Sequence, residues 1–332
     1  MRARRSPRHG RGRELLRVRR SRPARRARAR AGRRIAAARR EPGGRRVKLR
    51  IGTRGSALAL AQARWVARQL AERGDEGELV VIRTAGDRDQ TSPYAAVGAP
   101  GIFVREIEQA LLERRIDVAV HSYKDLPSHS PAELAVVAVP EREDPRDVLV
   151  SRADGPARAR RIGTSSARRR MLVTELHPGT EAVALRGNVP TRIDKLRRGE
   201  YDAIVLAAAG ITRLARAGEL ELAGLRIDAL DPRIYVPAPA QGALALQVRA
   251  DDACAARVAA LDRAEIAQPV RAEREFLRLA DAGCDAVIGA LAAPRAGGGF
   301  VLDALLERRG RLARARVEGA EPIALAADAF AR

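Results

Sequence analysis

Two short segments of this chain occur twice, and the repeats restrict the folds that the sequence can adopt. The segment "RIGTRGSAL" at 50–58 returns as "RIGTSSARR" at 161–169, and each is typical of a strand leading into a serine-capped helix. The segment "LLERRIDVAVHS" at 111–122 returns as "KLRRGEYDAIVLAA" at 195–208, where a helix, an aspartate and a buried strand follow one another. These repeats predict two domains of similar build.

Strand-like and helix-like segments alternate along the first of these domains. The predicted strands cover 47–53, 78–86 and 116–122, and amphipathic helices are predicted at 57–73, which Ser56 can cap, and at 101–115. This order is typical of an α/β domain with a mainly parallel sheet.

The whole chain divides into a tail and three domains. A basic tail at 1–46 precedes domain 1, which covers 47–145 and regains 238–262 after domain 2 at 146–237. Domain 3, at 263–332, has a helix and meander strands with a Gly-rich turn at 297–299, so it is predicted to be α+β. The predicted fold is α/β: two similar domains, like those of periplasmic binding proteins, flank a cleft, and a small C-terminal α+β domain follows.

The positive charge of the chain lies almost wholly in the tail. Residues 1–46 hold twenty arginines against two glutamates, so the remainder carries only +4 of the net +22. We expect the tail to be disordered, because it lacks apolar periodicity. Two interpretations of it stay open: an arm for nucleic acid or a membrane surface, and an extension upstream of the physiological start.

The composition also limits the class of protein. The chain has two cysteines, Cys254 and Cys284, which are too few for a disulfide framework, and the sequence has no apolar run long enough to span a membrane. Its four histidines show no metal-ligand spacing, so we expect no metal site. A cytoplasmic protein fits these features best.

Polar residues gather where predicted strands end and helices begin. In "HSYKDLPS" at 121–128 a buried strand ends beside Lys124 and Asp125. In "GTSSARRR" at 163–170 two cations stand in the first turn of a helix, where they oppose the helix dipole, so a bound anion explains them better than stability does. The arginines in such places are Arg54, Arg168, Arg169, Arg186, Arg192 and Arg213. Together they predict a site for a polyanion such as a polycarboxylate or a phosphate.

The same residues belong to a set of motifs that identifies the chain as similar to a known family. From about 48 to 332 it resembles porphobilinogen deaminase, also called hydroxymethylbilane synthase, an enzyme of tetrapyrrole and porphyrin biosynthesis. The motifs stand in the family's order: "IGTRGSALALAQA", "HSYKDLPS", "EREDPRD", "GTSSARRR", "LRGNVPTRIDKL", "YDAIVLAAAGITRL", "PAPAQGALAL" and "AGCDAVIGA".

The resemblance implies a covalent cofactor and a set of residues that bind it. In the family, a cysteine at the position of Cys284 holds a dipyrromethane through a thioether, and this group primes the addition of four porphobilinogen molecules before hydrolysis releases hydroxymethylbilane. The implied cofactor contacts are Ser122, Lys124, Ser165, Arg168, Arg169, Arg186 and Gly187. Cys254 matches no motif and is interpreted as a packing residue.

The resemblance also assigns catalysis and substrate binding. Asp125 matches the catalytic carboxylate, which protonates the departing amine and stabilises the cationic azafulvene-like intermediate. The implied contacts to the acetate and propionate groups of the substrate are Arg54, Ser56, Arg192, Arg213 and Gln241. A monomeric transferase with porphobilinogen as its small-molecule substrate is implied.

One departure and two alternatives remain at this point. The stretch "AAVGAPGIFVRE" replaces a lysine-bearing loop that many family members have, which puts the contacts of a covering loop in doubt. A non-catalytic two-domain anion-binding protein would share the architecture but would need no thiol at Cys284. A nucleic-acid binder would need basic and aromatic residues across the body, but aromatic residues make up only 3% of the chain.

Overall fold

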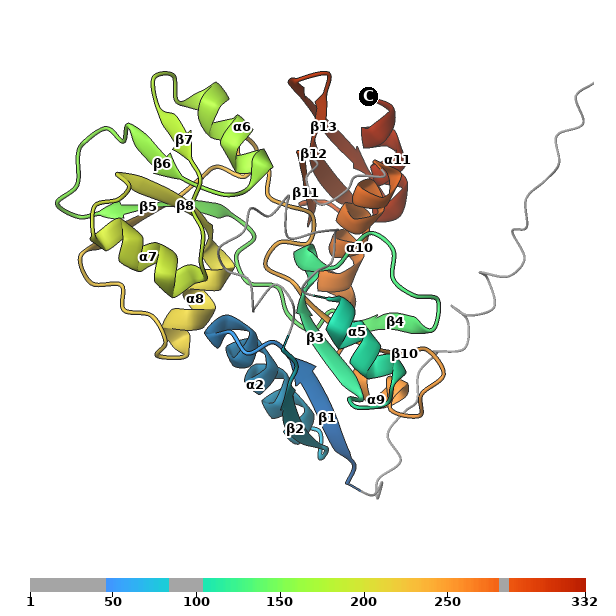
Figure 1. Ribbon diagram of the computed structural model, residues 1–332. Helices are drawn as coiled ribbons and strands as arrows, with labels where there is room; N and C mark the ends of the chain where they lie inside the picture. Colours follow the sequence, from blue (N-terminus) through green and yellow to red (C-terminus); the bar gives the residue numbers. More distant parts are fainter. Residues whose placement is uncertain (1–45, 84–103, 281–286) are drawn as a thin grey trace, which may run out of the picture. The chain divides into compact units, whose positions relative to one another are not determined.

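The computed structural model describes residues 46–83, 104–280 and 287–332 (Figure 1). Three features of the sequence analysis lie outside the described residues: the tail up to residue 45, the substituted loop before 104, and Cys284. The chain divides after Gly43 into two units, and the structure given below belongs to the unit Gly44–Arg332.

The first sheet contains five strands in the order β2-β1-β3-β10-β4. Strand β1 pairs in parallel with β2 and β3, whereas β10 pairs antiparallel with β3 and β4. Three helices and a 3₁₀ turn, η1, occur in the same segments of the chain. The bounds are β1 Lys48–Thr53, α2 Ala57–Ala71, β2 Glu76–Val81, α5 Arg105–Leu112, β3 Val118–Ser122, η1 Tyr123–Asp125, β4 Leu134–Ala138, β10 Leu244–Arg249 and α9 Ala255–Ala259.

The second sheet repeats this plan with the order β7-β6-β8-β5-β9. Strand β6 is parallel to β7 and β8, and β5 is antiparallel to β8 and β9. The bounds are β5 Asp147–Arg152, β6 Arg161–Gly163, α6 Ala167–Leu176, β7 Glu181–Val183, α7 Val189–Arg197, β8 Ala203–Ala207, α8 Ala208–Arg216 and β9 Leu225–Ala229. The two sheets correspond strand for strand, which confirms the predicted pair of similar α/β domains.

The prediction of a mainly parallel sheet is wrong in one respect, because half of the strand pairings in each sheet are antiparallel. The antiparallel partner in each case is a crossover strand. Strand β10 joins the first sheet only after the chain has passed through the second, and β5 joins the second after the chain has left the first. A strand that enters from another part of the chain is not bound by the parallel rule of a βαβ unit.

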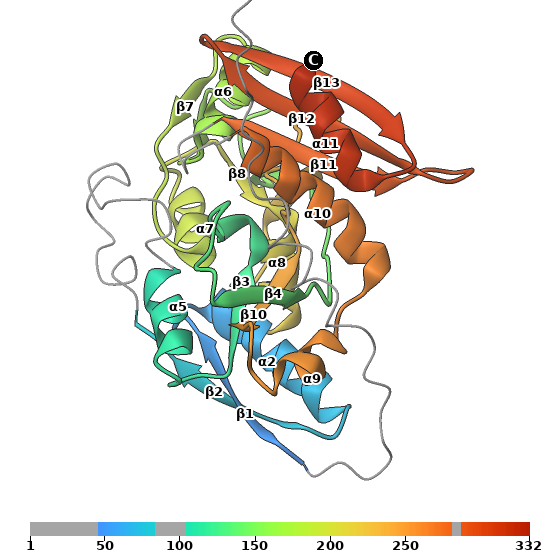
Figure 2. The ribbon, with the colours of Figure 1, turned by 90° about the vertical axis from the view of Figure 1, so that its right-hand side faces the viewer.

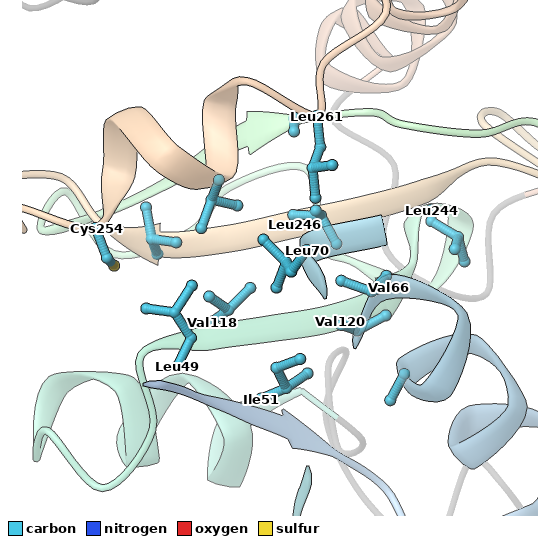
Figure 3. Packing of buried hydrophobic residues seen from close by; sticks show 14 of the residues in the cluster. Leu49, Ile51, Val66, Leu70, Val118, Val120, Leu244, Leu246, Cys254 and Leu261 are labelled. Atoms are coloured by element: carbon cyan, nitrogen blue, oxygen red, sulfur yellow. The ribbon is translucent and has the colours of Figure 1, made fainter. Parts of the chain in front are cut away.

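The core of the first α/β layer lies where α2 packs against β1, β3 and β10 (Figure 3). Ser56 caps α2, as predicted, by accepting a hydrogen bond from the backbone N of Ala59 at 3.4 Å. Val66 and Leu70 then lie on the buried face of the helix, against Ile51 and Leu246. The burial of this apolar set fixes the register of the strands that lead to the site.

A three-stranded antiparallel sheet, β11-β12-β13, forms the C-terminal part. Helices α10 and α11 lie side by side against it in both ribbon views (Figures 1 and 2). The predicted Gly-rich turn joins β11 to β12, and Gly297, Gly298 and Gly299 all adopt positive φ. Helix α11 is an element that the sequence analysis did not predict. The bounds are α10 Ala264–Leu279, β11 Ile288–Pro294, β12 Phe300–Arg308, β13 Arg311–Gly319 and α11 Pro322–Ala331.

We predict that Leu246→Ala lowers the free energy of unfolding by about 2–5 kcal/mol, because it removes a fully buried side chain from a packed cluster. The matched control is Val81→Ala on the exposed side of β2, expected to change it by less than about 0.5 kcal/mol. Urea denaturation measures both variants. Equal losses would show that the cluster around β10 is not the core of this layer.

Candidate active site

A pocket lies among elements of both α/β sheets. It encloses about 530 Å³ of empty space, its open mouth included. Helices α2, α6, α7 and α8 contribute lining residues, together with the end of β3, the η1 turn and the turn before β10.

Four cationic side chains line this pocket. Lys124 comes from η1, Arg169 from the first turn of α6, Arg192 from α7 and Arg213 from α8. Among the described lining residues there is no carboxylate. The pocket is therefore suited to an anion.

A buried carboxylate holds the two arginines at the start of α6. Asp147, the first residue of β5, is fully buried, and its Oδ1 and Oδ2 each lie 2.8 Å from a guanidinium nitrogen, of Arg169 and Arg168 respectively. Burial alone would raise the pKa of Asp147, but the two guanidiniums outweigh it and hold the pKa well below its usual range. Asp147 therefore supplies the anion that these cations need at a helix N-terminus.

Gln241 connects this carboxylate to the lysine. Its side-chain N–H group donates to Oδ1 of Asp147 at 2.8 Å and to the carbonyl of Pro145 at 2.8 Å. Its Oε1 accepts from Nζ of Lys124 at 3.3 Å and from Arg169 at 3.4 Å. The fully buried amide of Gln241 thus holds Lys124 and Arg169 at a fixed distance from each other.

Two observations indicate that the four cations that line the pocket, here called the cationic wall, can still pair with a bound anion. Burial lowers the pKa of Lys124 to about 8, although the neighbouring Asp125 opposes this shift. In the part of the chain that the structure describes, Nε of Arg169 is buried and has no hydrogen-bond partner. A carboxylate bound in the pocket would favour the charged form of Lys124 and supply an acceptor close to Arg169.

The other two pocket arginines are held by backbone carbonyls. Arg213 donates to the carbonyl of Gly242 at 2.8 Å and lies 3.8 Å from Glu141, and burial lowers its pKa. Arg192 donates through Nε to the carbonyl of Gly187 at 2.7 Å. Gly187 has a φ of +106°, and a Cβ there would lie 2.7 Å from the side chain of Thr191, so the turn before α7 requires glycine.

The remaining predicted residues lie outside the pocket lining or make local contacts. Ser122 lines the pocket and accepts from Gln62 at 3.0 Å. Ser165 donates to the carbonyl of Leu185, while its neighbour Ser166 caps α6. Asp125 is exposed at the end of η1.

The structure thus brings together only part of the predicted set. The pocket lining contains Ser122, Lys124, Arg169, Arg192 and Arg213. Arg168 and Gln241 connect to it through Asp147. The residues outside the described lining are Arg54, Ser56, Asp125, Ser165, Arg186 and Gly187, and Cys284 lies outside the described residues.

Sequence reasoning missed two members of the site, Asp147 and Gln62. Asp147 is the last residue of "EREDPRD", and it opens a buried strand, so a carboxylate in a core position was a usable signal. Gln62 lies on the buried face of α2 amid apolar residues, which is a similar signal.

The described ranges hold no group of three or more side chains able to bind a metal ion. Among the helices in those ranges, none has the length and apolar character needed to cross a membrane.

Comparison with known proteins gives matches across most of the chain. The family model described as "Porphobilinogen deaminase, dipyromethane cofactor binding domain" matches residues 49–257. The porphobilinogen deaminase of Thermus thermophilus is 46% identical over 279 residues, covering 81% of this chain and 89% of that protein. The porphobilinogen deaminase of Deinococcus radiodurans is 44% identical over 251 residues, covering 72% and 79% respectively.

Among solved structures, the chain is similar to the periplasmic VFT2 domain of BvgS from Bordetella pertussis. The TM-score is 0.38 at 18% identity, with 64% of this chain and 84% of that chain covered.

We predict that Asp147→Asn lowers the free energy of unfolding by about 3–5 kcal/mol, because it leaves two buried guanidiniums without a countercharge. The control is Asp228→Asn in the exposed pair with Arg226, expected to change it by less than about 1 kcal/mol. Urea denaturation at neutral pH compares them. If the two variants lost equally little, Asp147 would not be the countercharge of α6.

Proposed function

The chain belongs to the porphobilinogen deaminase family, and on this premise we propose that it joins four porphobilinogen molecules, with loss of ammonia, into the linear tetrapyrrole hydroxymethylbilane. This makes it a transferase of porphyrin biosynthesis, a hydroxymethylbilane synthase. Porphobilinogen is its small-molecule substrate.

The observation that best supports the proposal is the pocket with four cations and no described carboxylate. Porphobilinogen bears an acetate and a propionate group, so each unit brings two negative charges into the site. Guanidiniums bind carboxylates through paired hydrogen bonds and stay protonated when buried, which suits three of the four positions.

The alternative of a non-catalytic anion-binding protein would have a similar pocket. The family match favours the enzyme, because it covers both the residues of the pocket and the turn that holds Asp125. The two hypotheses differ in whether ammonia is released from porphobilinogen.

The pocket residues fit a dipyrromethane cofactor, because the lining is cationic and Nε of Arg169 lacks a described partner. In our proposal Cys284 holds the group through a thioether. The residues that would contact it are Ser122, Lys124, Ser165, Arg168, Arg169, Arg186 and Gly187. When bound, the dipyrromethane supplies the pyrrole carbon to which the first substrate unit is joined.

We assign the proton transfers to Asp125. The C–N bond of the aminomethyl group breaks with its electron pair on nitrogen, so the amine leaves as ammonia after receiving a proton. The substrate methylene then carries positive charge, which the carboxylate stabilises. The proton released as the new carbon–carbon bond forms returns to the same carboxylate. Asp125 directly follows Lys124, whose ammonium holds a substrate carboxylate next to it.

The substrate's acidic groups are assigned to a second set of residues. Arg192 and Arg213 line the pocket, and Gln241 orients its lysine. Arg54 and Ser56 complete the set at the start of α2. We also propose that the protein acts as a monomer in the cytoplasm, a reducing compartment in which Cys254 stays a thiol and Cys284 stays reduced until it forms the thioether.

We predict that the purified protein exceeds its sequence mass by one dipyrromethane, and that Cys284→Ala abolishes both the added mass and the activity. Cys254→Ala is the matched control and keeps both, because Cys254 is buried and burial raises its thiol pKa to about 12. Intact-mass spectrometry measures the increment. An active, unmodified Cys284→Ala protein would exclude the covalent cofactor.

A second substitution tests the chemistry. Asp125→Asn is expected to lower turnover by roughly 10²–10⁴-fold, the usual contribution of a positioned acid–base group. Asp154→Asn, on a strongly exposed side chain away from the pocket, serves as control and keeps full turnover. Ammonia release from porphobilinogen is the assay, and near-normal release by Asp125→Asn would place the proton transfers elsewhere.

A further inference from the structure

Arg274, on helix α10, reaches the turn that bears Lys124 and Asp125. Its guanidinium donates to three backbone carbonyls of that turn: Tyr123 at 3.4 Å, Leu126 at 2.8 Å, and Pro127. It also stacks over the ring of Tyr123, with the guanidinium carbon 4.9 Å from the ring centroid. One side chain from the C-terminal part thus contacts both sides of the two functional residues.

The turn makes few hydrogen bonds within itself. Its 3₁₀ segment is three residues long, and its closing hydrogen bond, from N of Leu126 to the carbonyl of Tyr123, is 3.3 Å long. Pro127 has no N–H to donate. The turn is fixed at its start, where N of Tyr123 donates to the carbonyl of Ala243 at 3.0 Å. It is also fixed at Leu126, which is buried against Val104 and Ala245. The carbonyls at its end depend on an outside donor, and Arg274 is that donor.

Glu273, the residue before Arg274, binds the backbone next to Gln241, whose side chain accepts a hydrogen bond from Lys124. Glu273 is fully buried, accepts paired hydrogen bonds from Arg142 at 2.7 and 3.0 Å, and accepts from the backbone N of Ala240 at 2.7 Å. Ala240 has a φ of +63° and directly precedes Gln241, the amide that accepts from Lys124. Adjacent residues of α10 therefore fix the two backbone segments whose side chains meet at Lys124.

We propose that Arg274 is a positioning residue for the catalytic turn: its guanidinium fixes residues 123–127 so that the Lys124 ammonium stays in the pocket and the Asp125 carboxylate stays beside it. The link to turnover rests on the function proposed above. The placement of Lys124 does not, and it is measured separately.

The acid–base behaviour of Lys124 reports this placement. Burial lowers its pKa from the ordinary value of 10.5 to about 8, and a loosened turn would return the amine toward water and raise that pKa. The charges that act on Lys124 are Asp125 on its own turn, Asp147 on β5, and Arg168 and Arg169 on α6, and the pocket adds Arg192 on α7 and Arg213 on α8. A role of Arg274 in stability alone would leave the pKa of the folded protein unchanged.

The test uses the full chain with Cys284→Ala, so that no covalent group contacts the lysine. The chain has only three lysines, and reductive methylation with ¹³C-formaldehyde gives few NMR signals, each of which is titrated against pH. Arg274→Gln is the main variant and Arg274→Lys the conservative one. Arg278→Gln, which removes a cation paired with Glu275 on the same helix, is the matched control.

We expect Arg274→Gln to raise the pKa of Lys124 by at least about one unit, Arg274→Lys to raise it less, and Arg278→Gln to leave it unchanged. With Cys284 restored, Arg274→Gln should lower kcat by roughly tenfold to a hundredfold, and Arg274→Lys should recover part of the loss. An unchanged Lys124 pKa in whichever Arg274 variant folds would overturn the proposal. A raised pKa in a protein that never releases ammonia would instead support the positioning role and reject the proposed function.

Discussion

The site depends on one buried carboxylate shared by two adjacent guanidiniums. Asp147 opens the crossover strand β5, and its contacts with Arg168 and Arg169 set the start of α6. The same two arginines also donate to the carbonyls of Val236 and Val205, so the ion pairs connect α6, β5 and β8 with the segment that returns to the first sheet. Buried ion pairs add little net stability compared with apolar packing, but they specify one arrangement of their partners. Here that arrangement determines the position of Arg169 in the pocket lining.

Arginine and lysine respond differently to burial, so the cations of the pocket differ in how firmly they keep their charge. Burial lowers the pKa of Arg168 and Arg213, yet a guanidinium starts from so high a value that it stays charged at neutral pH. The same burial lowers the pKa of Lys124 to about 8, so this amine is mostly charged at neutral pH and loses its proton in mildly alkaline solution. The pocket therefore combines guanidiniums that stay charged at any ordinary pH with one amine whose charge depends on pH, and this amine directly precedes Asp125.

The sequence predicted those structural features that depend on residues close together in the chain. The serine cap of α2, the repeated strand–helix units and the Gly-rich turn each follow from neighbouring residues, and the structure confirms them. The partners of the arginines were missed, because pairing Asp147 with Arg168 joins residues twenty-one positions apart across different elements. The direction of β5 and β10 was missed for the same reason. The hydrogen bonds from Arg274 to the turn at 123–127 join residues still further apart in the chain, and the motifs give no sign that these two segments are in contact.

The position of the crossovers accounts for the way the site uses both α/β sheets. Asp147 is the first residue of β5, and Gln241 lies three residues before β10, so the two strands that follow the crossings between the sheets begin next to each other, where Gln241 donates to Asp147. Both residues contact cations that line the pocket. In the proposed function, the dipyrromethane and four substrate units together form an enzyme-bound chain of six pyrroles with roughly a dozen carboxylates, whereas four cations line the described pocket. We infer that this bound chain also uses cations outside the lining, and Arg54 and Arg186 are the ones that the motifs indicate. The excess of carboxylates over pocket cations is the physical reason for expecting the bound chain to extend beyond the pocket.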